Sequence, residues 1–218
     1  MYLPYRIIRW VVTIFFKIYG RWEVVGREHV PSSGPVILVS NHISYLDPPL
    51  MGCALPRLGA FMAKADLWNN RFLAFVMPLL NVFPVNPGKA DLPSLRKALK
   101  VLESGMLLGL FPEGTRSKTG QLLPGEKGIA FLVKKSGAPI LPMAIIGANK
   151  MLPPGAKRLY KTKLKVAFGE PIFFTPDSSR EEIVTGVMRA IAKLLTDNGV
   201  PMKAAEDLTE EEKEKLEK

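Results

Sequence analysis

The sequence predicts one α/β domain with a mostly parallel or mixed twisted sheet flanked by helices, preceded by an N-terminal amphipathic helix. Three observations support this prediction. Short apolar runs alternate with segments of helical periodicity. A chain of 218 residues that is 47% hydrophobic is long enough for one well-buried core. The first 21 residues follow a pattern of their own. We therefore divide the chain into residues 1–21, 22–205 and 206–218.

The first expected element is a helix over residues 4–20, in which Pro4 suits the first turn and Gly20 the end. At about 100° per residue, its polar side chains fall on one narrow stripe and apolar residues cover the rest. The stripe consists of Arg6, Arg9, Thr13 and Lys17. A wide apolar face with a thin basic stripe is typical of a helix that lies in a membrane interface. The alternative is a core helix of a soluble domain.

Strands and helices are expected to alternate through residues 22–205. The runs suited to strands are 35–40, 59–63, 81–85, 106–111, 139–146 and 163–168. The segments with helical periodicity are 67–80, 92–102, 126–135 and 180–195. The tail, 206–218, carries seven acids and three lysines and is expected to be a solvated helix or a frayed end.

The net charge of +10 is uneven, because the acidic tail leaves +14 on residues 1–205. A basic body favours an anionic partner such as a nucleic acid, an anionic lipid or a phosphorylated substrate. Outside residues 4–20 we find no interleaving of aromatic and basic residues, so we expect no nucleic-acid partner. One cysteine and two histidines argue against a disulfide or a metal site and fit a reducing compartment. We expect no membrane-spanning helix, since prolines interrupt the longest apolar run.

Two polar clusters follow expected strands: NHISYLD at 41–47 and FPEGTRS at 111–117. In such sheets, chemistry gathers beyond the C-terminal ends of strands. His42 and Asp47 would point about 140° apart in a helix, but they can meet in a turn between strand and helix. With Asp47 as N-cap and Pro48 in the first turn, the carboxylate would orient His42 as a general base. The alternative is a structural histidine and a simple helix cap.

The second cluster offers groups suited to a polyol phosphate. Arg116 has a planar fork for a phosphate, Gly114 permits close backbone approach, and Glu113 can accept a hydrogen bond from a substrate hydroxyl. The alternative is a polar loop with a turn glycine. The sequence lacks a nucleophile elbow, a Walker A loop and a dinucleotide fingerprint. We therefore favour a base that activates a substrate hydroxyl over a side-chain nucleophile.

The two clusters, in this order, resemble the Asn-His-x4-Asp and Phe-Pro-Glu-Gly-Thr-Arg-Ser motifs of the glycerolipid acyltransferases. The chain is most similar to the bacterial type of 1-acylglycerol-3-phosphate (lysophosphatidic acid) acyltransferases, over about residues 22–170. One block departs from the family. In NVFPVNP, Asn81 replaces a glycine and Pro87 an arginine, so Lys64 or Lys89 is expected to supply the missing charge.

The resemblance implies acyl transfer from acyl-CoA or acyl carrier protein to the sn-2 hydroxyl of lysophosphatidic acid, giving phosphatidic acid. It implies His42 as the base, Asp47 as its partner, no acyl-enzyme, no cofactor and no metal. The residues expected to bind substrate are Asn41, Lys64, Lys89, Glu113, Gly114, Thr115, Arg116, Ser117 and Lys127.

The expected location is the cytoplasmic face of the cytoplasmic membrane, with the chain attached peripherally to an anionic surface. Three alternatives remain open: an acyltransferase that uses glycerol 3-phosphate or a glycolipid, a thioester hydrolase, and a non-catalytic basic membrane-binding module.

Overall fold

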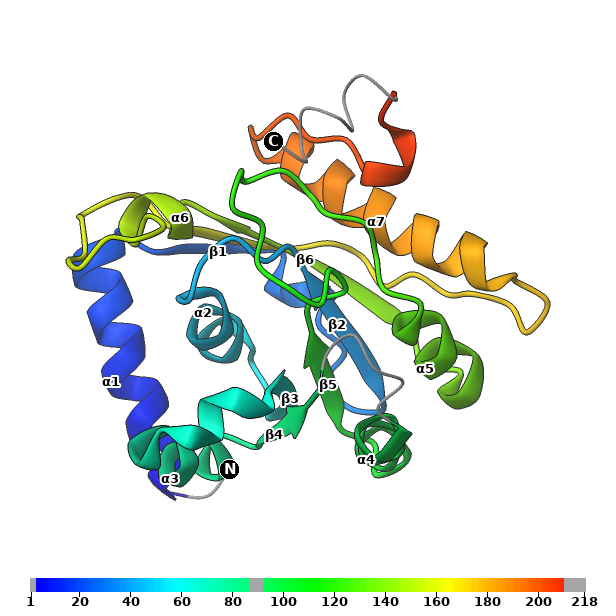
Figure 1. Cartoon of the computed structure of the whole chain (residues 1–218), viewed down its shortest axis with the longest axis horizontal. Coiled ribbons are helices and arrows are strands. Elements are labelled where there is room, and N and C mark those ends of the chain that lie inside the picture. The colour runs from blue at the N-terminus through cyan, green and yellow to red at the C-terminus, as the bar shows by residue number, and fades with distance from the viewer. Residues whose placement is uncertain (1–2, 87–91, 210–218) are drawn as a thin grey trace.

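The computed structural model describes residues 3–86 and 92–209, which form a 7-stranded sheet between two layers of helices (Figure 1). The strand order is β1-β7-β6-β2-β5-β3-β4. The strands are β1 (Glu23–Val25), β2 (Val36–Ser40), β3 (Gly59–Lys64), β4 (Val82–Val85), β5 (Leu107–Leu110), β6 (Ile140–Ile146) and β7 (Lys165–Phe168). Among these seven strands of the described residues, β6 and β7 are the one pair that runs antiparallel. The predicted α/β domain with a mixed sheet is confirmed.

The helices are α1 (Leu3–Gly20), α2 (Asp47–Ala54), α3 (Arg71–Leu79), α4 (Leu92–Glu103), α5 (Gly128–Ser136), α6 (Ala148–Met151) and α7 (Arg180–Asp197). Short 3₁₀ helices occupy Arg27–His29, Ala65–Asn69 and Ala205–Asp207. The single helix expected over 67–80 is divided in two. Asn70 separates the parts, because its side chain accepts hydrogen bonds from the backbone N–H groups of Phe72 and Leu73 and so starts α3 afresh.

Both faces of the sheet are buried. Helices α4, α5 and α7 cover one face, and α1, α2 and α6 cover the other (Figure 1). Along β2, Ile37 and Val39 belong to the first core, whereas Val36 and Leu38 belong to the second. A strand covered on both faces needs apolar residues at every position, which explains the unbroken run in β2.

The sheet topology brings the two polar clusters to one edge. β2 and β5 are parallel neighbours, with Val39 opposite Leu110, so the chain leaves both strands at the same end. β3 also runs parallel to β5, and its last residue, Lys64, therefore lies toward that same edge. Adjacent parallel strands thus carry segments 41–47 and 111–117 side by side.

Helix α1 has the expected position, but Arg9, in the middle of its polar stripe, turns toward the domain. The Arg9 guanidinium donates hydrogen bonds to the carbonyl groups of Cys53 and Leu55, where α2 ends. Carbonyl groups at a helix end lack partners within the helix, so a cation is favourable there. Tyr5 and Phe16 on the same side of α1 are buried. Arg9 is therefore part of the fold, and the expectation that it meets the headgroups of a membrane interface was wrong.

The outward face of α1 is apolar instead. It is made of Leu3, Ile7, Trp10, Val11 and Ile18, whose exposed fractions range from 52% to 67%. Arg6 and Lys17 are exposed as well. Among the helices of the described ranges, none is long and apolar enough to cross a membrane.

The tail begins with contacts to the domain. The Asp207 carboxylate accepts hydrogen bonds from the Arg189 guanidinium of α7, with Nε 3.0 Å from Oδ1. The helix or frayed end expected further along the tail, over 210–218, lies outside the described residues.

Candidate active site

A tight turn between β2 and α2 brings His42 to Asp47. The His42 Nδ1 atom lies 2.8 Å from Asp47 Oδ2. The same oxygen accepts hydrogen bonds from the backbone N–H groups of Ile43 at 2.6 Å and Ser44 at 2.7 Å. Asp47 is the first residue of α2 and not its N-cap, because its carboxylate turns back into the preceding turn and does not cap the helix. One oxygen thus holds both the turn and the imidazole.

The environment of the pair leaves one imidazole nitrogen for chemistry. Asp47 is fully buried, and burial raises its pKa, while hydrogen bonds from His42 and the turn oppose that rise. The His42 ring stacks on Phe111 with centroids 4.0 Å apart, and its side chain is 16% exposed. In the tautomer in which Nδ1–H donates to Asp47, Nε2 is the nitrogen that can accept a proton. A histidine held in this way by a carboxylate is able to act as a general base.

Both carboxylate oxygens of Glu113 accept hydrogen bonds from backbone N–H groups. Its Oε1 accepts from the His42 backbone N–H at 2.7 Å, and its Oε2 accepts from the Leu123 N–H at 2.9 Å. The residue is 4% exposed, and burial raises its pKa to about 7. The expected contact with a substrate hydroxyl is therefore replaced by a structural role: Glu113 links the loop of His42 to residues 117–127.

Asn41 and Ser117 are also structural, contrary to expectation. The Asn41 amide donates to the Ile145 carbonyl at 3.0 Å and accepts from the Ile145 N–H at 2.8 Å, which attaches the loop to β6. The Ser117 N–H donates to the His42 carbonyl at 2.8 Å, and its hydroxyl accepts from the Gly120 N–H at 3.1 Å. Both residues are buried, so neither presents its side chain to a substrate.

Gly114 serves the turn itself. Its φ of 64° lies in the left-handed region, and an added Cβ would come 3.1 Å from the Glu126 side chain. A side chain at this position is therefore strained whatever ligand is bound. Thr115, which follows it, is exposed.

Arg116 lies flat on an aromatic ring supplied by the first cluster. Its guanidinium carbon is 3.5 Å from the centroid of Tyr45, and Tyr45 is 66% exposed. Such stacking fixes the plane of the fork while leaving its edge open to solvent. Sequence reasoning missed Tyr45, although an aromatic residue within the same cluster as His42 was a usable signal.

Two of the three lysines expected at the site lie within the described residues. Lys64 at the end of β3 and Lys127 just before α5 are both exposed. Lys89 and Pro87 lie outside the described residues.

Asn81 adopts φ 56°, a conformation that asparagine tolerates better than most residues. Glycine, which the family has at this position, tolerates this conformation as well.

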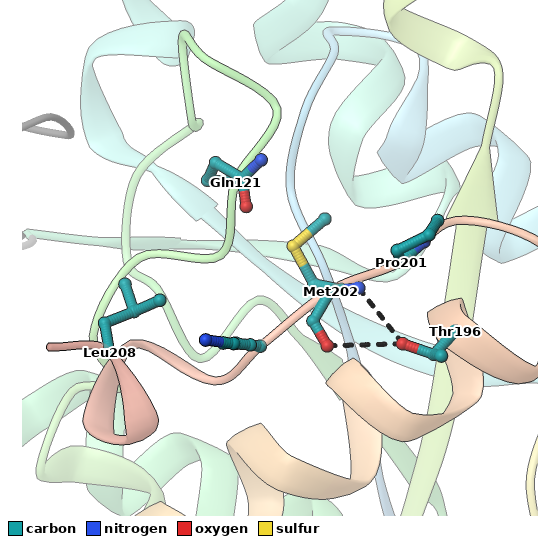
Figure 2. Close-up of a pocket in the computed structure, with 6 residues that line it drawn as sticks. Gln121, Thr196, Pro201, Met202 and Leu208 are labelled. Carbon is teal, nitrogen blue, oxygen red and sulfur yellow. Dashed lines mark hydrogen bonds between the residues drawn. The ribbon is translucent and has the colours of Figure 1, made fainter. Parts of the chain in front are cut away.

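A surface hollow lies apart from both clusters. It is lined by Gln121, Thr196, Pro201, Met202, Lys203 and Leu208 (Figure 2). The Thr196 hydroxyl donates to the Met202 carbonyl at 3.2 Å and accepts from the Met202 N–H at 3.0 Å, which fixes the chain after α7. No residue of 41–47 or 111–117 lines this hollow. Within the described ranges, no three His, Cys, Asp or Glu side chains are grouped to hold a metal.

Comparisons with known proteins show which family the chain resembles. A family model described as Acyltransferase matches residues 21–146. A 1-acyl-sn-glycerol-3-phosphate acyltransferase of Bacillus subtilis is 28% identical over 173 residues, which are 77% of this chain and 82% of that protein. A chloroplast 1-acyl-sn-glycerol-3-phosphate acyltransferase of Brassica napus is 28% identical over 168 residues, 75% of this chain but only 48% of its own length. The chain thus spans about half the length of that plant relative.

The fold is also similar to a solved structure. The crystal structure of the 1-acyl-sn-glycerophosphate (LPA) acyltransferase of Thermotoga maritima has a TM-score of 0.77 and 28% sequence identity to this chain. The match covers 89% of this chain and 79% of that one.

Proposed function

Because the chain belongs to the acyltransferase family, we propose that it transfers a fatty acyl group from an acyl thioester to the sn-2 hydroxyl of lysophosphatidic acid, giving phosphatidic acid in phospholipid synthesis. The observation that carries the proposal is the His42–Asp47 pair, 2.8 Å apart and beside the stacked Arg116. Relatives named for this reaction support the choice of acceptor.

His42 acts as the base in this proposal. Its Nε2 takes the proton of the acceptor hydroxyl while the oxygen attacks the thioester carbonyl. The new C–O bond forms, the C–S bond breaks, and the proton passes from His42 to the leaving thiolate. Asp47 stabilises the imidazolium in between. A thioester is already activated and Cys53 is buried, so the route needs no acyl-enzyme.

The acceptor phosphate binds at the edge of Arg116 that Tyr45 leaves open. Lys64 and Lys127 add positive charge around it, and the same role for Lys89 remains a prediction. Arg116→Lys replaces a flat, stacked fork with a point charge, so it should raise the KM for the acceptor more than the KM for the donor. An unchanged acceptor KM with a raised donor KM would assign Arg116 to the thioester.

Membrane association is part of the proposal. The outward face of α1 carries five exposed apolar side chains, and α3 adds Phe72 and Phe75, which are 71% and 70% exposed. Exposed apolar surface of this kind marks a site for a membrane or a partner. A helix that lies in one leaflet would hold the protein on the cytoplasmic face, where acyl-CoA or acyl carrier protein brings the donor.

Release of free thiol from a fatty acyl thioester, with and without lysophosphatidic acid, tests the proposed reaction. Release that depends on lysophosphatidic acid, with phosphatidic acid as product, is expected. Equal release without any acceptor would indicate a thioester hydrolase. If thiol is released only with glycerol 3-phosphate or a glycolipid, that compound is the acceptor. If no thiol is released with any acceptor, the result favours a non-catalytic module. His42→Ala is the matched control, and its melting temperature shows that the fold is retained.

A further inference from the structure

The chain between α6 and β7 is strongly basic. We call residues 150–165 the basic segment. It contains Lys150, Lys157, Arg158, Lys161, Lys163 and Lys165, and it has no Asp or Glu. This short segment thus carries six positive charges and no negative charge, and the net charge of the whole chain is +10.

Most of this charge is not neutralised within the fold. Lys163 lies 3.0 Å and Lys165 3.7 Å from carboxylate oxygens of Glu23. Across the described ranges, no ion pair of 4.0 Å or less involves Lys157, Arg158 or Lys161. Like charges held close together repel each other, so an external anion would be favourable here.

The cations have fixed positions because the segment is anchored. The Tyr160 N–H donates to the Met151 carbonyl at 2.9 Å, and Leu159 packs against the core. Lys157, Arg158 and Lys161 around that anchor are exposed. The basic segment therefore presents its charge from a structured loop.

The basic segment lies against the C-terminal end of α1, as Figure 1 shows. The Leu164 N–H donates to the Gly20 carbonyl at 2.7 Å. The Lys161 ammonium is 5.8 Å from the centroid of the Tyr19 ring. Ile18, in the last turn of α1, is 66% exposed. Charge from the loop and apolar surface from the helix thus lie next to each other.

We infer that the basic segment binds the anionic headgroups of the same lipid leaflet that receives the apolar face of α1. Stable peripheral attachment commonly needs two signals, one apolar and one polybasic, and the two lie together here. An RNA partner fits less well, because Tyr160 is the only aromatic residue in the segment and base stacking needs a platform of several. The inference rests on the membrane association proposed above and assigns its electrostatic part to a loop distant in sequence from α1.

Vesicle binding by the full chain tests the assignment. The probes are vesicles of phosphatidylcholine alone and vesicles that also contain phosphatidylglycerol. The test variant is Lys157→Gln, Arg158→Gln and Lys161→Gln together. The control makes the same change in charge at exposed residues of α4 and α5, through Arg96→Gln, Lys100→Gln and Lys135→Gln. Melting temperatures of both variants verify the fold.

We expect the test variant to bind anionic vesicles about tenfold or more weakly than the unmodified chain, and neutral vesicles equally well. The control should keep most of its preference for anionic vesicles. In the unmodified chain, added salt should remove the same preference. Equal losses in both variants would show an effect of net charge only, and unchanged binding by the test variant would overturn the inference. A loss seen with an RNA oligonucleotide but not with vesicles would overturn it in favour of nucleic acid.

The assay separates this inference from the proposals on which it rests. Acyl transfer to a short-chain soluble acceptor should be unchanged in the test variant. If the unmodified chain binds vesicles as expected but transfers no acyl group, only the proposed reaction fails. If it binds neither kind of vesicle, the proposed membrane association fails.

Discussion

Glu113→Gln tests how the two loops of the site are held together. In the folded protein, burial raises the pKa of Glu113 to about 7, against an ordinary value of 4.5. The unfolded chain therefore loses this proton at lower pH than the folded chain does. Stability due to this group falls as pH rises from about 4.5 to about 7, and it stays constant above that.

The magnitude follows from the size of the shift. A difference of this size corresponds to about 3 kcal/mol, of which about 2 to 3 kcal/mol is lost between pH 5 and pH 8. Glutamine cannot ionise, so the Glu113→Gln variant does not lose stability in this way as the pH rises. We therefore expect the free energy of unfolding of Glu113→Gln, relative to the unmodified chain, to improve by about 2 kcal/mol from pH 5 to pH 8.

Urea unfolding at several pH values measures this difference. Glu126→Gln, an exposed carboxylate in the same loop region, is the control and should show no such trend. The kinetics add a second criterion. Glutamine keeps one acceptor for the two N–H groups of His42 and Leu123, so the loops loosen and kcat should fall while the acceptor KM stays nearly constant. A raised acceptor KM together with a flat pH trend would refute the structural role and restore a substrate contact.

Further changes probe the rest of the site and α1. His42→Ala should lower acyl transfer by more than a thousandfold at an unchanged melting temperature. Asp47→Asn should also lose most activity, because the imidazole then adopts the wrong tautomer. Activity within tenfold of the unmodified chain would contradict the assignment of His42 as the base. Tyr45→Leu should raise the acceptor KM several-fold, whereas Tyr45→Phe keeps the stacked ring and should not, as steady-state kinetics will show. Trp10→Ser should weaken vesicle binding without changing stability, and Arg9→Gln should reduce the free energy of unfolding by about 1 to 3 kcal/mol; the reverse pattern would mean that the two faces of α1 are misassigned.

The sequence predicted the fold well because its strongest patterns are local. Runs of strand length and helical periodicity placed six strands and most helices, and the order of the clusters placed both at one edge. The three-residue strand β1 was missed because so short a segment shows no periodicity. Periodicity also shows which residues of α1 share a side, but not what that side meets, so Arg9 was placed at the headgroups of a membrane interface.

The roles of single polar residues were harder to predict for the same reason. Glu113 lies 71 residues from its backbone partner His42, and Asn41 lies 104 residues from Ile145. Residue type and spacing reveal that a carboxylate or an amide is present in a loop. Only the assembled sheet shows whether that group faces a ligand or a backbone N–H. The half-buried Arg116, stacked on Tyr45, and the buried Glu113 differ in this respect, although they belong to the same short cluster.

Helix α1 is joined to the domain by its own packing, and this limits how the protein can move. Phe16 and Tyr5 are buried, and Arg9 binds the end of α2, so the helix and the sheet form one body. Whichever surface the outer face of α1 contacts, the sheet edge that carries His42 then has a fixed orientation and a fixed distance relative to that surface. A domain on a flexible linker would sample many orientations before its site met a substrate. Here that orientational search is removed when the helix docks.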